Sequence, residues 1–190
     1  MGNFTFISTQ LPDVVIVEPA VFGDTRGYFM ETYHKEEFTA AGITCEFVQD
    51  NQSMSRQGVL RGLHFQTQHT QAKLVRVISG RVFDVGVDVR PGSPTFGRWA
   101  SAELNAENRR MLYVPQGFAH GFLVLSESAE FTYKCSDVYA PAFEGGVRWD
   151  DPDIGIKWPD VGMPFSLSEK DKALPLLKDS DTSFFERWAR

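Results

Sequence analysis

Apolar and polar residues alternate one by one in the middle of the chain, most strictly over residues 82–89. In an extended strand, successive side chains point to opposite faces, so this alternation predicts a β-strand. One face would carry Phe83, Val85, Val87 and Val89, and the other Asp84, Gly86 and Asp88. A Ser-Gly turn signal at 79–80 separates this strand from the apolar run before it. The pattern therefore predicts a β-hairpin over residues 74–89.

Similar patterns recur as short strands at intervals of about ten residues. The clearest of them span residues 98–104, 110–115, 120–126 and 129–139. A Pro- and Gly-rich loop, residues 90–97, separates the first of these segments from the strand at 82–89. This rhythm is typical of an antiparallel sandwich or barrel, and the sequence predicts a mainly β protein.

Helical patterns are confined to short pieces of the chain. Residues 34–43 form one, and residues 167–177 form another, for which Ser168 is a suitable N-cap. We expect a third helix over residues 182–190, which would pack on the body of the protein through Phe184, Phe185 and Trp188.

The composition indicates one folded domain. A chain of 190 residues can bury a substantial core, and 42% hydrophobic residues with 16 Phe argue against disorder. No repeat or linker divides the sequence, so we expect a single domain over residues 1–190, with residues from about 175 onward as a peripheral tail.

Charge and cysteine content narrow the function classes. A net charge of −6 without a basic run argues against a nucleic-acid partner. No apolar run approaches the roughly 20 residues that span a membrane, and the N-terminal residues do not read as a secretory signal. Cys45 and Cys135 are too few for a disulfide framework, so a reducing cytoplasm is the expected location. Any anionic ligand would be bound by a few locally placed cations.

The stretch PQGFAHGF, residues 115–122, resembles the second half of the cupin signature, in which its histidine often binds a metal. The first half would supply a His-x-His pair and a glutamate, yet only His64 stands in the comparable strand. His64 and His120 fall short of the three protein ligands of a catalytic zinc or a facial-triad iron site. We expect a barrel with neither a metal nor another cofactor.

The strand GVLRGLHFQ, residues 58–66, holds two residues that do not belong in an ordinary core. His64 is either a buried histidine bonded to the backbone or a general base, because imidazole titrates near neutral pH. Arg61 stays charged, so it either points to solvent or meets an anion from the protein or a ligand.

Other candidates also have a purely structural alternative. Tyr133 falls on the less polar face of its strand and would point into the barrel, as packing or as a general acid. Lys73 opens a strand, where a lysine is usually solvated. Asp171 lies three residues after Ser168, where an acidic residue serves a capping box whether or not it also takes part in catalysis.

Taken together, these segments closely resemble the dTDP-4-dehydrorhamnose 3,5-epimerases, a family of nucleotide-sugar enzymes with a cupin-like jelly roll. The resemblance runs from about residue 12 to about residue 175. The matching blocks, in the same order, are VFGDTRGYFMETY, FVQDNQSMSRQGVLRGLHFQ, AKLVRV, VFDVGVDVRPGSPTFG, VPQGFAHGFLV, EFTYKC, RWDDPDIGIKWP and LSEKD.

The resemblance implies roles for individual residues. His64 corresponds to the base, Asp171 to the carboxylate that pairs with it, Tyr133 to the proton donor on the opposite face of the sugar, and Lys73 to the cation near the C4 oxygen. The positions that match substrate-binding residues are Arg26, Glu31, Gln49, Asp50, Asn51, Arg61, His120, Glu144 and Lys170. It also implies a homodimer, in which residues 21–29 lie at the interface and reach the neighbour's site.

The implied reaction is the cofactor-independent epimerisation of dTDP-4-dehydro-6-deoxy-D-glucose at C3 and C5, giving dTDP-4-dehydro-L-rhamnose for dTDP-L-rhamnose biosynthesis. Both carbons flank the C4 ketone, so removal of either proton gives an enolate. Three alternatives stay open at this point. They are a 3- or 5-epimerase of another deoxysugar pathway, a non-catalytic sugar-binding cupin, and a metal-dependent cupin oxygenase.

Overall fold

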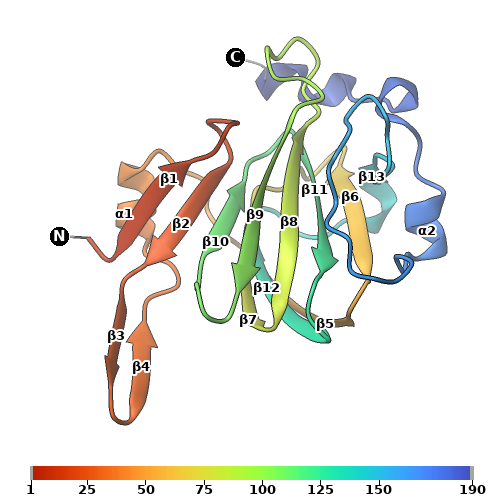
Figure 1. Ribbon diagram of the computed structural model, residues 1–190. Helices are drawn as coiled ribbons and strands as arrows, with labels where there is room; N and C mark the ends of the chain where they lie inside the picture. The colour runs from red at the N-terminus through yellow and green to blue at the C-terminus, as the bar shows by residue number, and fades with distance from the viewer. Residues whose placement is uncertain (1, 189–190) are drawn as a thin grey trace.

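The computed structural model describes residues 2–188, which fold as two antiparallel sheets packed face to face (Figure 1). The strand order is β1-β2-β10-β7-β12-β5 in the six-stranded sheet and β13-β6-β11-β8-β9 in the five-stranded sheet. The strands are β1 (Phe4–Ser8), β2 (Val15–Pro19), β3 (Val21–Asp24), β4 (Gly27–Met30), β5 (Gln49–Arg56), β6 (Leu60–Gln66), β7 (Lys73–Ser79), β8 (Arg81–Asp88), β9 (Trp99–Asn105), β10 (Met111–Val114), β11 (Phe118–Val124), β12 (Ser128–Cys135) and β13 (Glu144–Gly146). The expected mainly β, cupin-like fold is confirmed.

The helices are short and peripheral, as expected. The α-helices are α1 (Lys35–Ala40) and α2 (Glu169–Lys172), and 3₁₀ turns cover Pro141–Phe143, Leu177–Asp179 and Ser183–Trp188. The last of these replaces the third helix predicted at 182–190, of which residues 189–190 lie outside the described part. Within residues 2–188, no helix is long and apolar enough to cross a membrane.

The hairpin predicted over residues 74–89 is wrong. Strand β7 pairs with β10 and β12, whereas β8 pairs with β9 and β11 in the other sheet. Gly80 has a φ of +77°, and a Cβ there would lie 2.0 Å from the Ser128 carbonyl oxygen. The Ser-Gly signal correctly marks a sharp change of direction, but that change carries the chain from one sheet to the other. A local turn signal does not specify which strand becomes the partner.

The alternation in β8 separates two different environments. Its odd-numbered residues, such as Val85 and Val87, form an apolar cluster with Leu177 and Phe185 from the C-terminal segment, which covers the outer face of the five-stranded sheet. Its even-numbered residues point between the two sheets, where Val82 joins the central core and Asp84 is fully buried. The more polar face of this strand is therefore the inward one.

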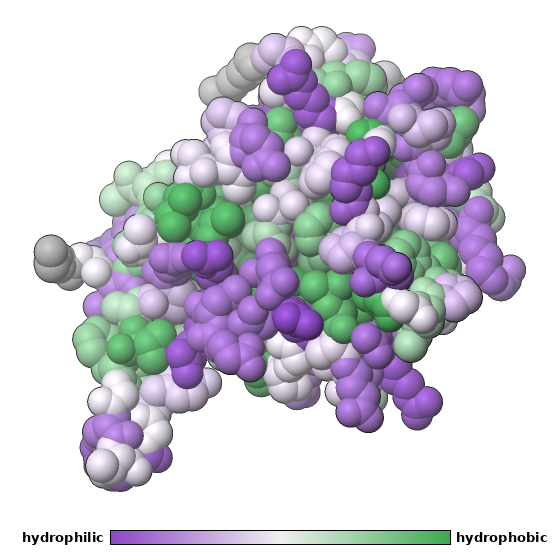
Figure 2. All heavy atoms as spheres, viewed as in Figure 1, coloured by the Kyte–Doolittle hydropathy of each residue, from purple (hydrophilic) through white to green (hydrophobic). Residues whose placement is uncertain are grey.

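The β3–β4 hairpin forms a separate two-stranded sheet that projects from the body (Figure 1). All residues of β3 are exposed, and Phe22, Tyr28 and Phe29 expose 55%, 58% and 65% of their surface. Apolar surface on this projection is visible in Figure 2. Aromatic residues are normally buried, so this hairpin has the character of a contact surface.

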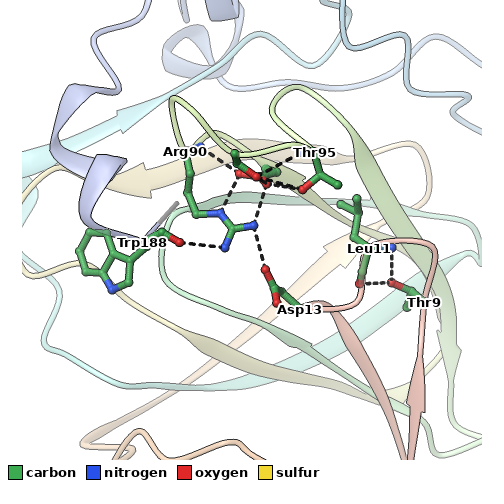
Figure 3. A network of polar contacts seen from close by, with 8 residues as sticks. Thr9, Leu11, Asp13, Arg90, Thr95 and Trp188 are labelled. Carbon is green, nitrogen blue, oxygen red and sulfur yellow. Dashed lines mark hydrogen bonds and ion pairs between the residues drawn. The ribbon is translucent and has the colours of Figure 1, made fainter. Parts of the chain in front are cut away.

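A polar network around the buried Arg90 joins the loop between β1 and β2 and the last described residue, Trp188, to the barrel (Figure 3). The Arg90 guanidinium lies 2.7 Å from an Asp88 carboxylate oxygen and 2.8 Å from one of Asp13. It also donates to the backbone carbonyl of Trp188 at 3.2 Å. The charge of Arg90 is thus paired within the protein, and this network is a structural element remote from the cavity described next.

Candidate active site

A cavity of about 480 Å³ lies inside the barrel, lined from β6, β7, β11, β12 and the α2 region. Seven of the residues predicted from the sequence line it: Arg61, His64, Lys73, His120, Tyr133, Lys170 and Asp171. An adjoining cavity of about 230 Å³ shares His64, Lys73 and Tyr133 with the first and adds Gln49, Asn51 and Glu144. The fold therefore gathers most of the predicted site from distant parts of the chain.

His64 and Asp171 form a close pair, with 2.5 Å between Nε2 and Oδ1. Only 5% of the Asp171 side chain is exposed, against 28% of that of His64. Ser168 caps α2 as predicted, because its Oγ accepts from the Asp171 backbone N–H at 3.1 Å. The same hydroxyl donates to the second Asp171 oxygen at 2.8 Å. Asp171 thus occupies a helix-capping position and also holds the imidazole, so the two interpretations of this residue are compatible.

The environment keeps Asp171 ionised. Burial alone would raise its pKa, but the hydrogen bonds from His64 and Ser168 prevail, and the pKa lies below the ordinary value. A carboxylate anion beside an imidazole fixes its orientation and favours the imidazolium form. His64 is therefore held with one nitrogen on the carboxylate, in a position suited to accept a proton from a ligand in the cavity.

Lys73 is not the solvated strand-end lysine that its position suggested. It lines both cavities, and its Nζ lies 6.0 Å from the centre of the Tyr133 ring. Burial lowers the pKa of its ammonium group, while Cys135, Asp84 and Glu144 oppose this effect. A cation that lines a partly enclosed cavity interacts more strongly than in bulk water with a negative charge that develops beside it.

Tyr133 points into the barrel, as predicted, where it packs on the central core next to Phe131. Burial raises the pKa of its phenol, so the hydroxyl is protonated at neutral pH. Among residues 2–188, this hydroxyl has no hydrogen-bond partner, which leaves its proton available to a bound molecule. The purely structural alternative, a buried tyrosine with a capped hydroxyl, does not describe this geometry.

Arg61 lies at the solvent side of the larger cavity and donates to Ser55 Oγ at 3.2 and 3.0 Å. No carboxylate within the described chain lies at ion-pair distance from it. Its charge is therefore free to meet an anionic ligand. At the rim of the smaller cavity, Glu144 forms an ion pair with Lys170 and accepts from the Tyr139 hydroxyl at 2.7 Å.

Three predicted binding residues lie away from these cavities in the described structure. Arg26, at the tip of the projecting hairpin, pairs with Asp24, and 88% of its side chain is exposed. Asp50 points to the outer face of the six-stranded sheet, where Lys134 lies 3.0 Å away. Glu31 accepts from the Asn3 side chain at 3.1 Å. Their roles in binding stay predictions.

Sequence reasoning missed two polar residues of this region. Asp84 is fully buried and contacts His120, and Tyr139 lines the smaller cavity. The sequence did contain a signal that Asp84 could be functional. Asp84 is a charged residue within a strand of alternating apolar residues, and no basic residue lies next to it in the sequence. Periodicity could not indicate that this face would point inward.

The donor atoms do not form a metal centre. Within residues 2–188, no group of three or more His, Cys, Asp and Glu side chains is arranged to hold an ion. His64 and His120 each pair with a carboxylate of their own, Asp171 and Asp84. This donor set does not fit the three-ligand sites of catalytic zinc or non-haem iron.

The fold and the cavity together define a sugar-epimerase type of jelly roll, and comparison with known proteins identifies the family. The family model described as dTDP-4-dehydrorhamnose 3,5-epimerase matches residues 8–179, and the chain belongs to this family. The chain is 50% identical over 181 residues to the dTDP-4-dehydrorhamnose 3,5-epimerase of Methanothermobacter thermautotrophicus, covering 95% of this chain and 98% of the relative.

Solved structures agree with this assignment. A Legionella pneumophila dTDP-6-deoxy-D-glucose-3,5-epimerase, in complex with dTDP-4-keto-L-rhamnose, matches with a TM-score of 0.92 and 49% identity over 96% of this chain and 97% of that one. A 3′-monoepimerase from Streptomyces bikiniensis, in complex with dTDP-quinovose, matches with a TM-score of 0.84 and 37% identity over 90% and 87% of the two chains. The greater identity is with the double epimerase.

Proposed function

We propose that this chain epimerises dTDP-4-dehydro-6-deoxy-D-glucose at C3 and C5 to dTDP-4-dehydro-L-rhamnose, a step of dTDP-L-rhamnose biosynthesis. The observation that carries the proposal is one cavity in which a carboxylate-held imidazole, a lysine ammonium group and an unpaired phenol converge. These are the groups that an enolate mechanism needs.

Each residue has a distinct step in this mechanism. His64 removes the proton from a carbon next to the ketone, and Asp171 stabilises the resulting imidazolium. Lys73 stabilises the negative charge on the C4 oxygen of the enolate. Tyr133 then gives a proton to the opposite face of the carbon and inverts it, while Arg61 binds the diphosphate. After each inversion His64 releases its extra proton to solvent and Tyr133 takes up a proton from solvent, which restores the starting state of both residues.

The decisive experiment is incubation of the purified protein with dTDP-4-keto-6-deoxyglucose in D₂O, followed by NMR of the sugar. Deuterium at both C3 and C5 supports the proposal. Deuterium at only one carbon means a single-centre epimerase, like the Streptomyces bikiniensis relative. No deuterium at either carbon, with binding retained, would indicate the non-catalytic sugar-binding alternative.

We predict that exhaustive chelation leaves turnover unchanged, because the histidines of the cavity are engaged with carboxylates and no step above needs a metal. The measurement is the epimerisation rate before and after dialysis against EDTA, with metal content checked by elemental analysis. Loss of turnover that one divalent metal restores would contradict this prediction and return the cupin oxygenase class to consideration.

We also propose a homodimer in which the projecting hairpin reaches the neighbour's site. Its exposed Phe22 and Phe29 give it an apolar surface, and Arg26 at its tip does not reach the cavity of its own chain. The expected result of light scattering is the mass of a dimer, and Phe22→Asp should shift it toward the monomer and reduce activity. A stable and fully active monomer would contradict the proposal.

We also propose that the protein is located in the cytoplasm. The free thiols of Cys45 and Cys135 support this location, because the cytoplasm keeps cysteines reduced.

A further inference from the structure

A second carboxylate–imidazole pair lies beside the first. His120 on β11 is the register partner of His64 on β6, so the two histidines stand opposite each other on neighbouring strands. The Nε2 atom of His120 lies 3.0 and 3.1 Å from the two carboxylate oxygens of Asp84 on β8. The Asp84 side chain is completely buried, and 8% of that of His120 is exposed. His120 lines the same cavity as His64.

The pairing of strands β8 and β11 does not depend on this carboxylate–imidazole pair. Strands β8 and β11 are already joined in continuous register from Asp88–Phe118 to Val82–Val124. Replacing a buried ion pair with apolar side chains of similar size is often neutral or stabilising, because burial of charge is costly. A buried ionisable pair in a cavity is therefore a candidate functional element rather than a structural one.

The contact with Asp84 determines which nitrogen of His120 a ligand can use. An ionised carboxylate only accepts hydrogen bonds, so with Asp84 ionised it is Nε2 that carries the proton pointing at Asp84. Neutral His120 then has its lone pair on Nδ1, which has no hydrogen-bond partner within residues 2–188. Because the ring also stacks over Phe131 at 6.2 Å, its plane is fixed. His120 thus offers one oriented acceptor for a hydroxyl group of a bound sugar.

Asp84 also acts electrostatically on Lys73, which lies on a strand of the other sheet. The titratable groups around the ammonium group are Asp84 from β8, Cys135 and Tyr133 from β12, and Glu144 from β13. Glu144 is already paired with a lysine of α2, and burial raises the pKa of the Cys135 thiol. Burial raises the pKa of Asp84 above its ordinary value, and the neighbouring His120 and Lys73 oppose this rise only in part. Asp84 is the buried carboxylate that can compensate the charge of Lys73.

We propose that Asp84 is a positioning residue of the epimerase site, an inference that rests on the proposed function. Asp84 holds His120 as the Nε2–H tautomer, so that Nδ1 accepts a hydrogen bond from a sugar hydroxyl. It also supplies the buried negative charge that keeps Lys73 protonated beside the developing enolate. The two histidines of the cavity thus have different tasks, each set by its own carboxylate: His64 moves the proton and His120 orients the sugar.

The test is Asp84→Asn, which keeps the shape but removes the charge and lets His120 adopt either tautomer. We expect kcat to fall about 10- to 100-fold, because misorientation of the sugar is costly. The alkaline limb of the pH profile should move to lower pH, because loss of a nearby negative charge favours neutral Lys73. The matched control is Asp88→Asn. Asp88 is buried on the same strand but bonds to Arg90 outside the cavity.

Asp88→Asn should lower the melting temperature and leave the pH profile of the remaining activity unchanged. The tautomer is read independently from ¹⁵N NMR of the histidines in the free enzyme at about pH 8, where imidazole is normally neutral. His120→Gln assigns the signals. The wild-type protein should show His120 protonated at Nε2 alone, and Asp84→Asn should show a mixture of tautomers.

The inference would be overturned if the Asp84→Asn variant kept the kcat, the pH profile and the His120 tautomer of the wild-type protein. A fall in activity that Asp88→Asn reproduces without a change of pH profile or tautomer would also overturn it, because it would show a structural role only. Turnover by the wild-type protein is measured first. Its absence would reject the proposed function, whereas the NMR comparison, which needs no substrate, would still decide whether Asp84 sets the tautomer of His120.

Discussion

His64→Asn is expected to abolish the incorporation of deuterium at both C3 and C5, with a loss of turnover of about 10²–10⁴-fold or more. Asparagine keeps a polar side chain in the cavity but cannot accept and carry a proton at neutral pH. Without the base no enolate forms, so exchange and inversion fail together. NMR of the sugar in D₂O and the steady-state rate measure the two effects.

The chain offers a matched control in His69→Asn. His69 lies on an exposed loop, where its Nδ1 is 3.4 Å from an Asp137 oxygen. Its φ of 52° is one that asparagine tolerates well. We expect this variant to exchange and invert the substrate at nearly the wild-type rate. If His64→Asn kept near-normal exchange, another residue would be the base and the mechanism proposed above would be wrong.

Tyr133→Phe is expected to separate exchange from inversion. The base and Lys73 are intact in this variant, so the enolate still forms and deuterium returns to the carbon from the same face. The donor on the opposite face is missing, so inversion should fall about 10²–10⁴-fold, while exchange stays within about 10-fold of the wild type. The measurement is the ratio of deuterium incorporation to formation of the epimerised product.

Tyr113→Phe is the matched control for this second prediction. Tyr113 lies on β10, where its hydroxyl is 3.8 Å from Cys45 Sγ, and it lines neither of the two cavities. The variant should invert the sugar normally. Equal losses of exchange and inversion in Tyr133→Phe would mean that Tyr133 helps to form the enolate, and a different residue would then be the donor.

The local elements were largely predictable because their signals are local. Alternation identified the strands, and Ser168 marked the start of α2, where its hydroxyl caps the Asp171 N–H. The helix predicted over residues 167–177 ends at Lys172, and Pro175 in the sequence explains why it cannot continue. The hairpin at 74–89 failed because strand partners are chosen by the packing of two sheets, which a turn signal at Gly80 does not encode.

By itself, the sequence determined the strand-rich fold class, the family blocks, and the residue types that the reaction needs. These properties depend on the alternation of apolar and polar residues and on the order of the motifs, and both can be read directly from the sequence. Tertiary structure alone decided which faces point inward. The C-terminal segment covers the apolar outer face that includes Val85, so Asp84 on the other face turns into the barrel toward His120.

Tertiary structure also decided which residues meet in the candidate active site. His64 and Asp171 are 107 residues apart in sequence, yet their side chains meet at 2.5 Å. Periodicity places a residue on a face of its own strand, but it holds no information about the strand or helix that comes to lie opposite. The chemistry of each group was therefore visible in the sequence. The pairing of imidazole with carboxylate was decided only when the two sheets and α2 came together around one cavity.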